Sequence, residues 1–283
     1  MRGDNAVIIG LITTPLYHSR QEQYNYFIQH VPQINISPDT MLSRIVLFDL
    51  PSQQGTSWSL NPWKTRLILN YKGIEYDTEW VEYPDIEPRL RSLGLAPNHK
   101  DAPGYFTDYS IPAIKYEDGT YEMDSWPIAQ ELERRYPSPS LHLNEPVTVK
   151  VRDQISKILS PIILQLLPRV PDQLPERSRE YYNRTREEMF GRPLAELHKE
   201  ALENAEDGWK QLQEPVKEIA DLLRKHDGPF FLGETVSYAD FILVSMFHFV
   251  ERFDEQAYQR LMSFDPAFSK VYEAAREWFV RDT

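Results

Sequence analysis

Cysteine is absent from the 283 residues of this chain. Its absence excludes disulfide bonds, cysteine-ligated metals and every mechanism that uses a protein thiol. Long apolar runs are also lacking, because none approaches the ~20 residues of a membrane span, so no membrane insertion is expected. Residues 6–16 are apolar enough for a weak signal sequence, but Asp4 interrupts the basic segment that should precede them and no small-residue cleavage site follows clearly. We therefore expect a cytoplasmic protein.

Positive charge is scarce, with 31 lysines and arginines against 43 aspartates and glutamates and a formal net charge of -12. This balance argues against a nucleic-acid partner, and no cluster of Lys and Arg lies among aromatic residues. The seven histidines show no His-Glu-x-x-His or comparable spacing, so no metal site is predicted. An anionic ligand would have to be held by local hydrogen-bond donors.

The chain exceeds the length of one typical domain, and its composition changes along the sequence. Residues 1–43 are polar and aromatic without a sustained period, which indicates an appended N-terminal extension. Residues 44–138 mix strand and helix patterns, and the proline-rich, polar residues 139–147 are typical of a linker. Residues 148–283 are helical throughout, so two domains are predicted.

The first domain begins with a near-continuous apolar run at residues 44–50, which predicts a buried strand. Asn61 is a favourable N-cap and Pro62 a favourable first residue for the helix that follows. A second strand is predicted at residues 75–83 and a short helix at residues 85–93. A parallel pairing of the two strands would require the right-handed crossover that the first helix supplies, as in the thioredoxin arrangement.

The most informative stretch is residues 109–136, which predicts a strand, a turn, a strand and a helix. Asp118-Gly119 between two short apolar runs is a strong hairpin signal, and Asp124-Ser125 lies where a helix should begin. Pro112 cannot donate a ladder hydrogen bond, so it implies an edge strand, a bulge or a cis peptide. The backbone of Ile111 would then lie beside a helix N-terminus, a corner that suits a ligand with a peptide-like backbone and a carboxylate.

Two motifs resemble a known family. Ser110-Ile111-Pro112, followed by Asp124-Ser125-Trp126, resembles the glutathione site of thioredoxin-fold glutathione transferases. Further along, Phe231-Leu232-Gly233 and Ser237-Tyr238-Ala239-Asp240 resemble the segment that caps a core helix in their helical domain, where Ser237 and Asp240 would form a capping box. The resemblance covers about residues 44–280. It implies an α/β thioredoxin-like domain followed by an all-α domain.

Within the family, Trp63-Lys64-Thr65, Asp124-Ser125-Trp126 and residues 184–191 are most similar to the fungal etherase-related class, which is similar to bacterial glutathione-dependent β-etherases. The absence of cysteine excludes the family members that use a cysteine. The first strand ends at Phe48-Asp49-Leu50 without a tyrosine. A mechanism in which a tyrosine hydroxyl stabilises the glutathione thiolate is therefore not expected either.

The resemblance implies that the thiol of bound glutathione becomes a thiolate, although a free thiol titrates near ~8.5. A hydroxyl donor at a helix N-terminus stabilises the thiolate. Ser59 lies two residues before Asn61 and falls on the serine of the family motif when Trp63 is the anchor. Ser57 and Thr56 compete for this role, because one loop residue of misalignment exchanges them. A hydroxyl that only stabilises the turn is compatible with each of the three.

By the same resemblance, the backbone of Ile111, ahead of a cis Pro112, would pair with the cysteinyl backbone of glutathione. Asp124 and Ser125 would hold its γ-glutamyl end. Asp124 stands where glutamate is more common, as in etherase-like members.

Two lysines and three aromatic residues complete the predicted site. Lys100 and Lys64 are candidates for the glycine carboxylate of glutathione, although each could be an ordinary solvated lysine. The hydrophobic co-substrate should lie between the two domains, where Trp58, Tyr181 and Tyr182 could line its pocket or simply pack in the core.

Three functions remain open at this point. The first is a glutathione S-transferase that acts on a small hydrophobic electrophile, such as a secondary metabolite. The second is a glutathione-dependent cis-trans isomerase, in which reversible thiolate addition to a conjugated alkene permits rotation. The third is a non-catalytic glutathione or ligand carrier that kept the fold. A homodimer is the family expectation.

Overall fold

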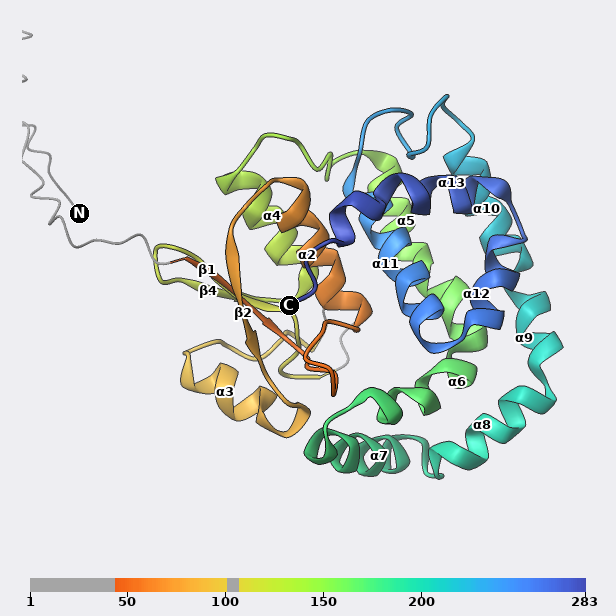
Figure 1. The fold of residues 1–283 in the computed structure, drawn as a ribbon, viewed down its shortest axis with the longest axis horizontal. Helices are drawn as coiled ribbons and strands as arrows, with labels where there is room; N and C mark the ends of the chain where they lie inside the picture. The colour runs from red at the N-terminus through yellow and green to blue at the C-terminus, as the bar shows by residue number, and fades with distance from the viewer. Residues whose placement is uncertain (1–43, 101–106) are drawn as a thin grey trace, which may run out of the picture. The chain divides into compact units, whose positions relative to one another are not determined.

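A computed structural model describes residues 44–100 and 107–283, drawn as a ribbon in Figure 1. The predicted extension, residues 1–43, lies outside the described residues, as do residues 101–106 of the loop that leads to Pro112. The predicted domains 44–138 and 148–283 fall within a single unit of contacts, Leu42–Thr283.

The sheet of the first domain has the strand order β2-β1-β3-β4. Its strands are β1 (Ile45–Asp49), β2 (Tyr76–Trp80), β3 (Ala113–Lys115) and β4 (Tyr121–Met123). β1 is parallel to β2, with Ile45 opposite Tyr76, and antiparallel to β3, with Leu47 opposite Ile114. Ile45 and Leu47 are fully buried because the apolar run of β1 lies in the interior of the sheet.

Helices connect and cover this sheet: α2 (Leu60–Tyr71), the 3-10 turn η1 (Tyr83–Asp85), α3 (Ile86–Ser92) and α4 (Ser125–Arg135). α2 links the parallel strands β1 and β2, as a crossover must. Figure 1 shows α2 and α4 on one side of the sheet and α3 on the other. The predicted order of strand, helix, strand, helix, hairpin and helix is confirmed.

Two element boundaries differ from the prediction. α2 begins at Leu60 with Ser59 as its N-cap, so the prediction of Asn61 as the cap is wrong. Asn61 lies in the first turn, where its Oδ1 accepts a hydrogen bond from Lys64 Nζ at 2.9 Å. Pro62 fits this shifted start because the first helical turn needs no N–H donors. β2 ends at Trp80 rather than near residue 83 because the chain turns into η1 at Tyr83.

The second domain is helical, as predicted. Its elements are α5 (Pro146–Leu159), η2 (Ser160–Ile162), α6 (Ile163–Leu166), η3 (Leu167–Gln173), α7 (Glu176–Phe190), α8 (Leu194–Glu203), α9 (Ala205–Gln211), α10 (Gln213–Leu223), α11 (Tyr238–Phe253), α12 (Glu255–Met262), α13 (Pro266–Ala275) and η4 (Arg276–Phe279). α11 is buried along almost its whole length and packs against α2, α5, α12 and α13, which confirms it as the core helix. Within residues 44–100 and 107–283, no helix has the length and hydropathy that a bilayer span requires.

The predicted capping box begins α11. The carboxylate of Asp240 accepts hydrogen bonds from the N–H and the hydroxyl of Ser237, both at 2.8 Å, and from the N–H of Phe231 at 2.9 Å. Burial raises the pKa of Asp240 to about 6, and these three donors oppose the rise. The cap therefore ties the turn around Phe231 to the first turn of the core helix.

Candidate active site

The predicted ligand-binding corner, which consists of the Ile111 backbone and the helix start at Asp124-Ser125, lies where β3, β4 and α4 meet. The peptide bond between Ile111 and Pro112 is cis. The Pro112 carbonyl accepts a hydrogen bond from the Asp124 N–H at 3.0 Å, and the Ser110 N–H donates to Met123 Sδ at 3.2 Å. No hydrogen bond among the described residues uses the N–H or the C=O of Ile111. Both groups can therefore serve an extended ligand backbone beside the start of α4.

The start of α4 is organised by Asp124, which has a positive φ of 78°. Its Oδ1 accepts a hydrogen bond from the Trp126 N–H at 3.3 Å and lies 3.4 Å from Ser125 Oγ. Ser125 is buried, with 8% of its surface exposed. The N-terminus of an 11-residue helix and these two side chains form a polar end to the corner, where an anion is favoured.

The helical domain holds this end of the corner in place. The hydroxyl of Tyr238, the first residue of α11, donates a hydrogen bond to the Ser125 carbonyl at 3.2 Å. The ring of Tyr238 lies 5.8 Å from that of Trp126. Burial raises the pKa of Tyr238, so its hydroxyl stays protonated and remains a donor.

The two candidate lysines differ in environment. Lys64 lies on α2, partly buried. Burial lowers its pKa to about 8, while the nearby Asp124 carboxylate acts in the opposite direction. Lys64 thus lies near Asp124, at the corner between α2 and α4. Lys100 is exposed at the edge of residues 101–106, and the structure does not place it at the corner.

The three candidate hydroxyls lie in one loop but have different surroundings. Ser59 is the N-cap of α2, is partly buried, and makes no capping hydrogen bond through its side chain. Thr56 Oγ1 lies 3.0 Å from Ser52 Oγ and accepts a hydrogen bond from Arg252 of α11 at 3.1 Å. The Thr56 hydroxyl is thus engaged between the two domains, whereas that of Ser59 is not.

Ser57 faces the protein interior. Only 1% of its surface is exposed, and its N–H donates to the Asp282 carbonyl at 2.8 Å. Burial raises the pKa of Asp49, while Arg66 and the Ser57 hydroxyl favour the carboxylate. The side chain of Ser57 therefore lies in the interior near the buried Asp49, and its Oγ has no hydrogen-bond partner among the described residues.

Comparisons with known proteins identify the family of this chain. The family described as "Glutathione S-transferase, N-terminal domain" matches residues 58–135, and "Glutathione S-transferase, C-terminal domain" matches residues 151–278. The "Glutathione S-transferase-like protein ustS" of Aspergillus flavus is 36% identical over 238 residues, which cover 78% of this chain and 85% of that protein. The chain belongs to the glutathione S-transferase family.

Solved structures of the family share the whole described fold. Glutathione transferase GSTFuA3 from Phanerochaete chrysosporium has a TM-score of 0.75 at 29% identity, and the match covers 86% of this chain and 100% of that one. A glutathione S-transferase of Ceriporiopsis subvermispora, solved in complex with glutathione, has a TM-score of 0.74 at 30% identity over 84% of this chain and 99% of that one. The predicted thioredoxin-like domain followed by a helical domain is thereby confirmed.

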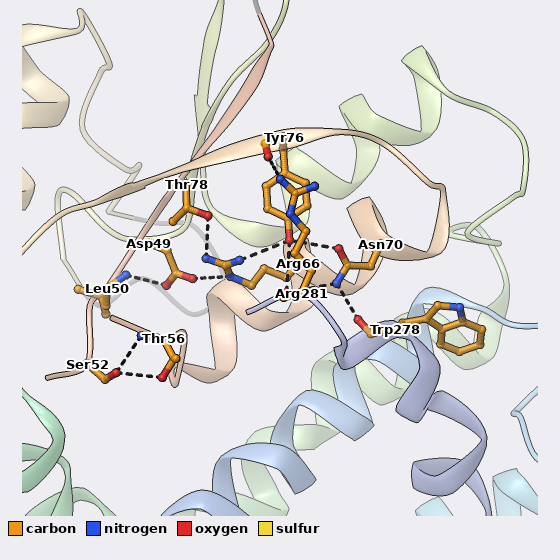
Figure 2. Close-up of polar contacts among 10 residues, drawn as sticks. All are labelled: Asp49, Leu50, Ser52, Thr56, Arg66, Asn70, Tyr76, Thr78, Trp278 and Arg281. Carbon is orange, nitrogen blue, oxygen red and sulfur yellow. Dashed lines mark hydrogen bonds and ion pairs between the residues drawn. The ribbon is translucent and has the colours of Figure 1, made fainter. Parts of the chain in front are cut away.

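Behind the loop of residues 51–59, called the Ser59 loop below, lies an ion pair that the sequence interpretation missed. Arg66 Nε is 2.7 Å from Asp49 Oδ2, and both side chains are fully buried (Figure 2). Arg66 also donates to Thr78 Oγ1 at 3.0 Å and to the Tyr76 hydroxyl at 3.3 Å. The sequence does carry a signal for this pair. Arg66 is a charged residue on the apolar face of a helix, and Asp49 is one at the end of an apolar strand.

The predicted co-substrate aromatics form a packed cluster between the domains of this transferase-family protein. Trp58 is 2% exposed and meets Phe253 of α11 edge-on, with ring centroids 5.7 Å apart. Tyr83 of η1 lies 6.5 Å from the ring of Trp58, 6.5 Å from Tyr181 and 5.4 Å from Tyr182. Trp58 and Tyr182 are buried against their neighbours, and Tyr181 is the partly exposed member.

Hydrogen bonds and an ion pair also join residues 82–85 to the start of α7, beside these aromatic residues. Glu82 Oε2 accepts hydrogen bonds from the N–H and the hydroxyl of Ser178 at the start of α7, at 3.1 and 2.9 Å. The Ser178 hydroxyl oxygen accepts from the Tyr83 N–H at 3.1 Å, and Arg177 forms a two-pronged pair with Asp85, both contacts at 2.9 Å. η1 and α7 are thereby held at a fixed distance, which sets the position of Tyr83 among the aromatics.

Proposed function

We propose that this family member binds glutathione and uses the Ser59 hydroxyl to stabilise its thiolate for attack on a hydrophobic electrophile. The observation that carries the proposal is the position of Ser59 as the N-cap of α2, with a hydroxyl that makes no capping bond. Thr56 is engaged by Ser52 and Arg252, and Ser57 is buried beside Asp49. Ser59 is therefore the best supported of the three candidates.

The proposed chemistry uses two features of the N-terminus of α2. Its unpaired N–H groups carry partial positive charge, and the Ser59 O–H can donate a hydrogen bond to sulfur. Together they favour the thiolate over the thiol, which otherwise titrates near ~8.5. The thiol proton leaves to solvent, and the sulfur electron pair forms a carbon–sulfur bond. The displaced electron pair departs with a leaving group, or takes up a proton when the electrophile is an epoxide or a conjugated alkene.

The corner beside α4 fits the rest of the tripeptide. The N–H and C=O of Ile111, which make no hydrogen bond with another described residue, suit the cysteinyl backbone, with Pro112 holding the turn. The Asp124 carboxylate suits the α-amino group of the γ-glutamyl end, and Ser125 with the α4 N-terminus suits its α-carboxylate. Lys64 would neutralise one of the two carboxylates, and Lys100 stays a second candidate.

The test is Ser59→Ala against Ser57→Ala, with the exposed α3 residue Ser92→Ala as the matched control. A hydrogen bond to a charged group is worth roughly 1.5–3 kcal/mol, and one pKa unit is about 1.4 kcal/mol. Ser59→Ala should therefore lower the conjugation rate at neutral pH roughly 10-fold or more while glutathione affinity changes little. An unchanged rate removes Ser59 from the mechanism, and a loss confined to Ser57→Ala transfers the role to Ser57.

Product analysis separates the reactions that the same thiolate could carry out. A conjugate with the combined mass indicates transfer. A product of unchanged mass with glutathione regained indicates cis-trans isomerisation, and a cleaved aryl ether indicates an etherase reaction of the kind suggested by the etherase-related resemblance. Glutathione affinity without turnover of any electrophile indicates a carrier. Mass spectrometry of metabolite mixtures incubated with and without glutathione distinguishes all four outcomes.

The proposal also includes a homodimer in the cytoplasm that accepts a small hydrophobic electrophile between the domains. Trp58, Tyr181 and Tyr182 are proposed to border that substrate, with Tyr181 as the most accessible of the three. Light scattering of the purified chain tests the dimer, and fractionation of source cells tests the location.

A further inference from the structure

The end of the described chain returns to the thioredoxin-like domain. η4 packs against α2, and the Trp278 carbonyl accepts a hydrogen bond from Asn70 Nδ2 at 2.7 Å (Figure 2). The Trp278 ring lies 5.2 Å from Tyr71 of α2 and 5.6 Å from Phe241 of α11, both edge-on. Trp278 thus anchors the segment that follows it on α2.

Arg281 contacts the start of β2. Its guanidinium stacks over the Tyr76 ring with 4.2 Å to the centroid, donates to the Tyr76 carbonyl, and lies 3.2 Å from a carboxylate oxygen of Glu75. The Tyr76 hydroxyl donates to Asn70 at 3.1 Å and accepts from Arg66 at 3.3 Å. Figure 2 shows Arg281 in the same group of polar contacts as the buried Asp49–Arg66 pair.

The next residue reaches the loop itself. The Asp282 carbonyl accepts the Ser57 N–H at 2.8 Å, two residues before Ser59. Burial lowers the pKa of Arg252, and the nearby Asp282 carboxylate opposes this shift. The guanidinium of Arg252 donates a hydrogen bond to Thr56 Oγ1 at 3.1 Å. Thr56 and Ser57, which lead towards the N-cap Ser59, are therefore both held by groups outside the loop.

We propose that the segment from Trp278 to Asp282 positions the Ser59 loop for thiol activation, with Arg281 as its main positioning residue. This inference rests on the proposed role of Ser59. Arg281 holds β2, and so acts on the sulfur only through the Asp282 carbonyl and the Ser57 backbone. A shift of the Ser59 oxygen by a fraction of an ångström is enough to weaken a hydrogen bond that must form in one geometry.

The test compares Arg281→Ala with Arg281→Lys and with Val280→Ala, a neighbouring side chain that is 81% exposed. The thiol pKa of bound glutathione is followed by the ultraviolet absorbance of the thiolate, and glutathione affinity by calorimetry. Arg281→Ala should raise that thiol pKa by about 0.5–1 unit and lower kcat/KM at neutral pH about 3- to 10-fold. The dissociation constant of glutathione should stay within about 2-fold. Arg281→Lys should be intermediate, and Val280→Ala should match the unmodified protein.

A second variant lacks Asp282 and Thr283, which removes the acceptor of the Ser57 N–H and keeps the Arg281 side chain, although the Arg281 carbonyl becomes the terminal carboxylate. It should show the same rise in thiol pKa. If both variants fold, as judged by near-ultraviolet circular dichroism, and keep the original thiol pKa, the positioning role is wrong. A loss of glutathione affinity and melting temperature with an unmoved thiol pKa also overturns it. If the unmodified protein itself shows no thiolate with glutathione bound, the proposed function fails and this inference fails with it.

Discussion

Arg66 Nε lies 2.7 Å from Asp49 Oδ2, and neither side chain is exposed to solvent. The partners of each charge are also internal. Arg66 donates to Thr78 and Tyr76, and the Leu50 N–H donates to Asp49 Oδ1 at 2.6 Å. The pair joins the end of β1 to the middle of α2, on either side of the loop that carries the candidate hydroxyls. Its integrity therefore bears on both the stability of the domain and the geometry of that loop.

Arg66→Met should destabilise the protein by about 3–5 kcal/mol, because it leaves Asp49 as a buried charge without its partner. Urea unfolding followed by tryptophan fluorescence measures the change. The double variant Arg66→Met with Asp49→Asn removes the orphaned charge while keeping an acceptor for the Leu50 N–H, so it should recover much of the loss. A single variant within about 1 kcal/mol of the unmodified protein contradicts a structural role for the pair.

Much of the fold follows from local patterns. The apolar run of β1, the Asp118-Gly119 turn and the capping box at Ser237 each act through neighbouring residues, so the sequence predicts them. The start of α2 does not follow, because Ser59 and Asn61 are both good caps within three residues. The loop before α2 is held by contacts with residues far along the chain, and a single sequence does not show which of the two caps those contacts favour.

The candidate site shows the same limit. Ser57 and Thr56 could not be separated from Ser59 by spacing, because the contacts that distinguish them come from Asp282 and Arg252, far along the chain. Ile111, Pro112, Asp124 and Ser125 were easier to place. They belong to one hairpin and the helix that follows it, so their proximity is a consequence of local connectivity.

Ser125→Ala should weaken glutathione binding about 10- to 150-fold, because one hydrogen bond of roughly 1.5–3 kcal/mol to a charged carboxylate is lost. Calorimetric titration with glutathione measures the change. Ser263→Ala removes an exposed serine hydroxyl on the helical domain and serves as the matched control. Full affinity in Ser125→Ala is incompatible with a γ-glutamyl subsite at the start of α4.

Asp240→Asn should destabilise the protein by roughly 2–3 kcal/mol. The amide replaces one acceptor oxygen with a donor, which faces the N–H and hydroxyl donors of Ser237 and Phe231 in a buried cap. Thermal and urea unfolding measure the loss. Asp153→Asn, an exposed aspartate on α5, should change stability by less than about 0.5 kcal/mol. Equal effects of the two substitutions would show that the capping box contributes little.

His248 of α11 is held neutral between α2 and the end of the chain. Its ring lies 4.9 Å from Trp63 and 4.7 Å from Phe279. Nδ1 is 3.0 Å from the Tyr272 hydroxyl, whose own hydrogen goes to Glu251 at 2.5 Å, so Nδ1 must carry the proton that it shares with Tyr272. Burial, followed by the positive charges of Arg252 and Arg276, lowers the pKa of His248 to about 4.

His248→Gln should remove part of the acid sensitivity of this protein. In the unfolded chain a histidine takes up a proton near pH ~6.5, whereas folded His248 does so only near pH 4. The unfolded state therefore binds more protons between these values. The contribution of His248 to stability is complete above pH ~6.5, falls as the pH drops towards 4, and changes no further below pH 4. The total loss is roughly 3 kcal/mol, because each pKa unit corresponds to about 1.4 kcal/mol. The free energy of unfolding from pH 8 to 4 should be less steep in His248→Gln, while the exposed His226→Gln keeps the original slope. Parallel curves for all three proteins would mean that His248 titrates in the folded state as it does in the unfolded chain.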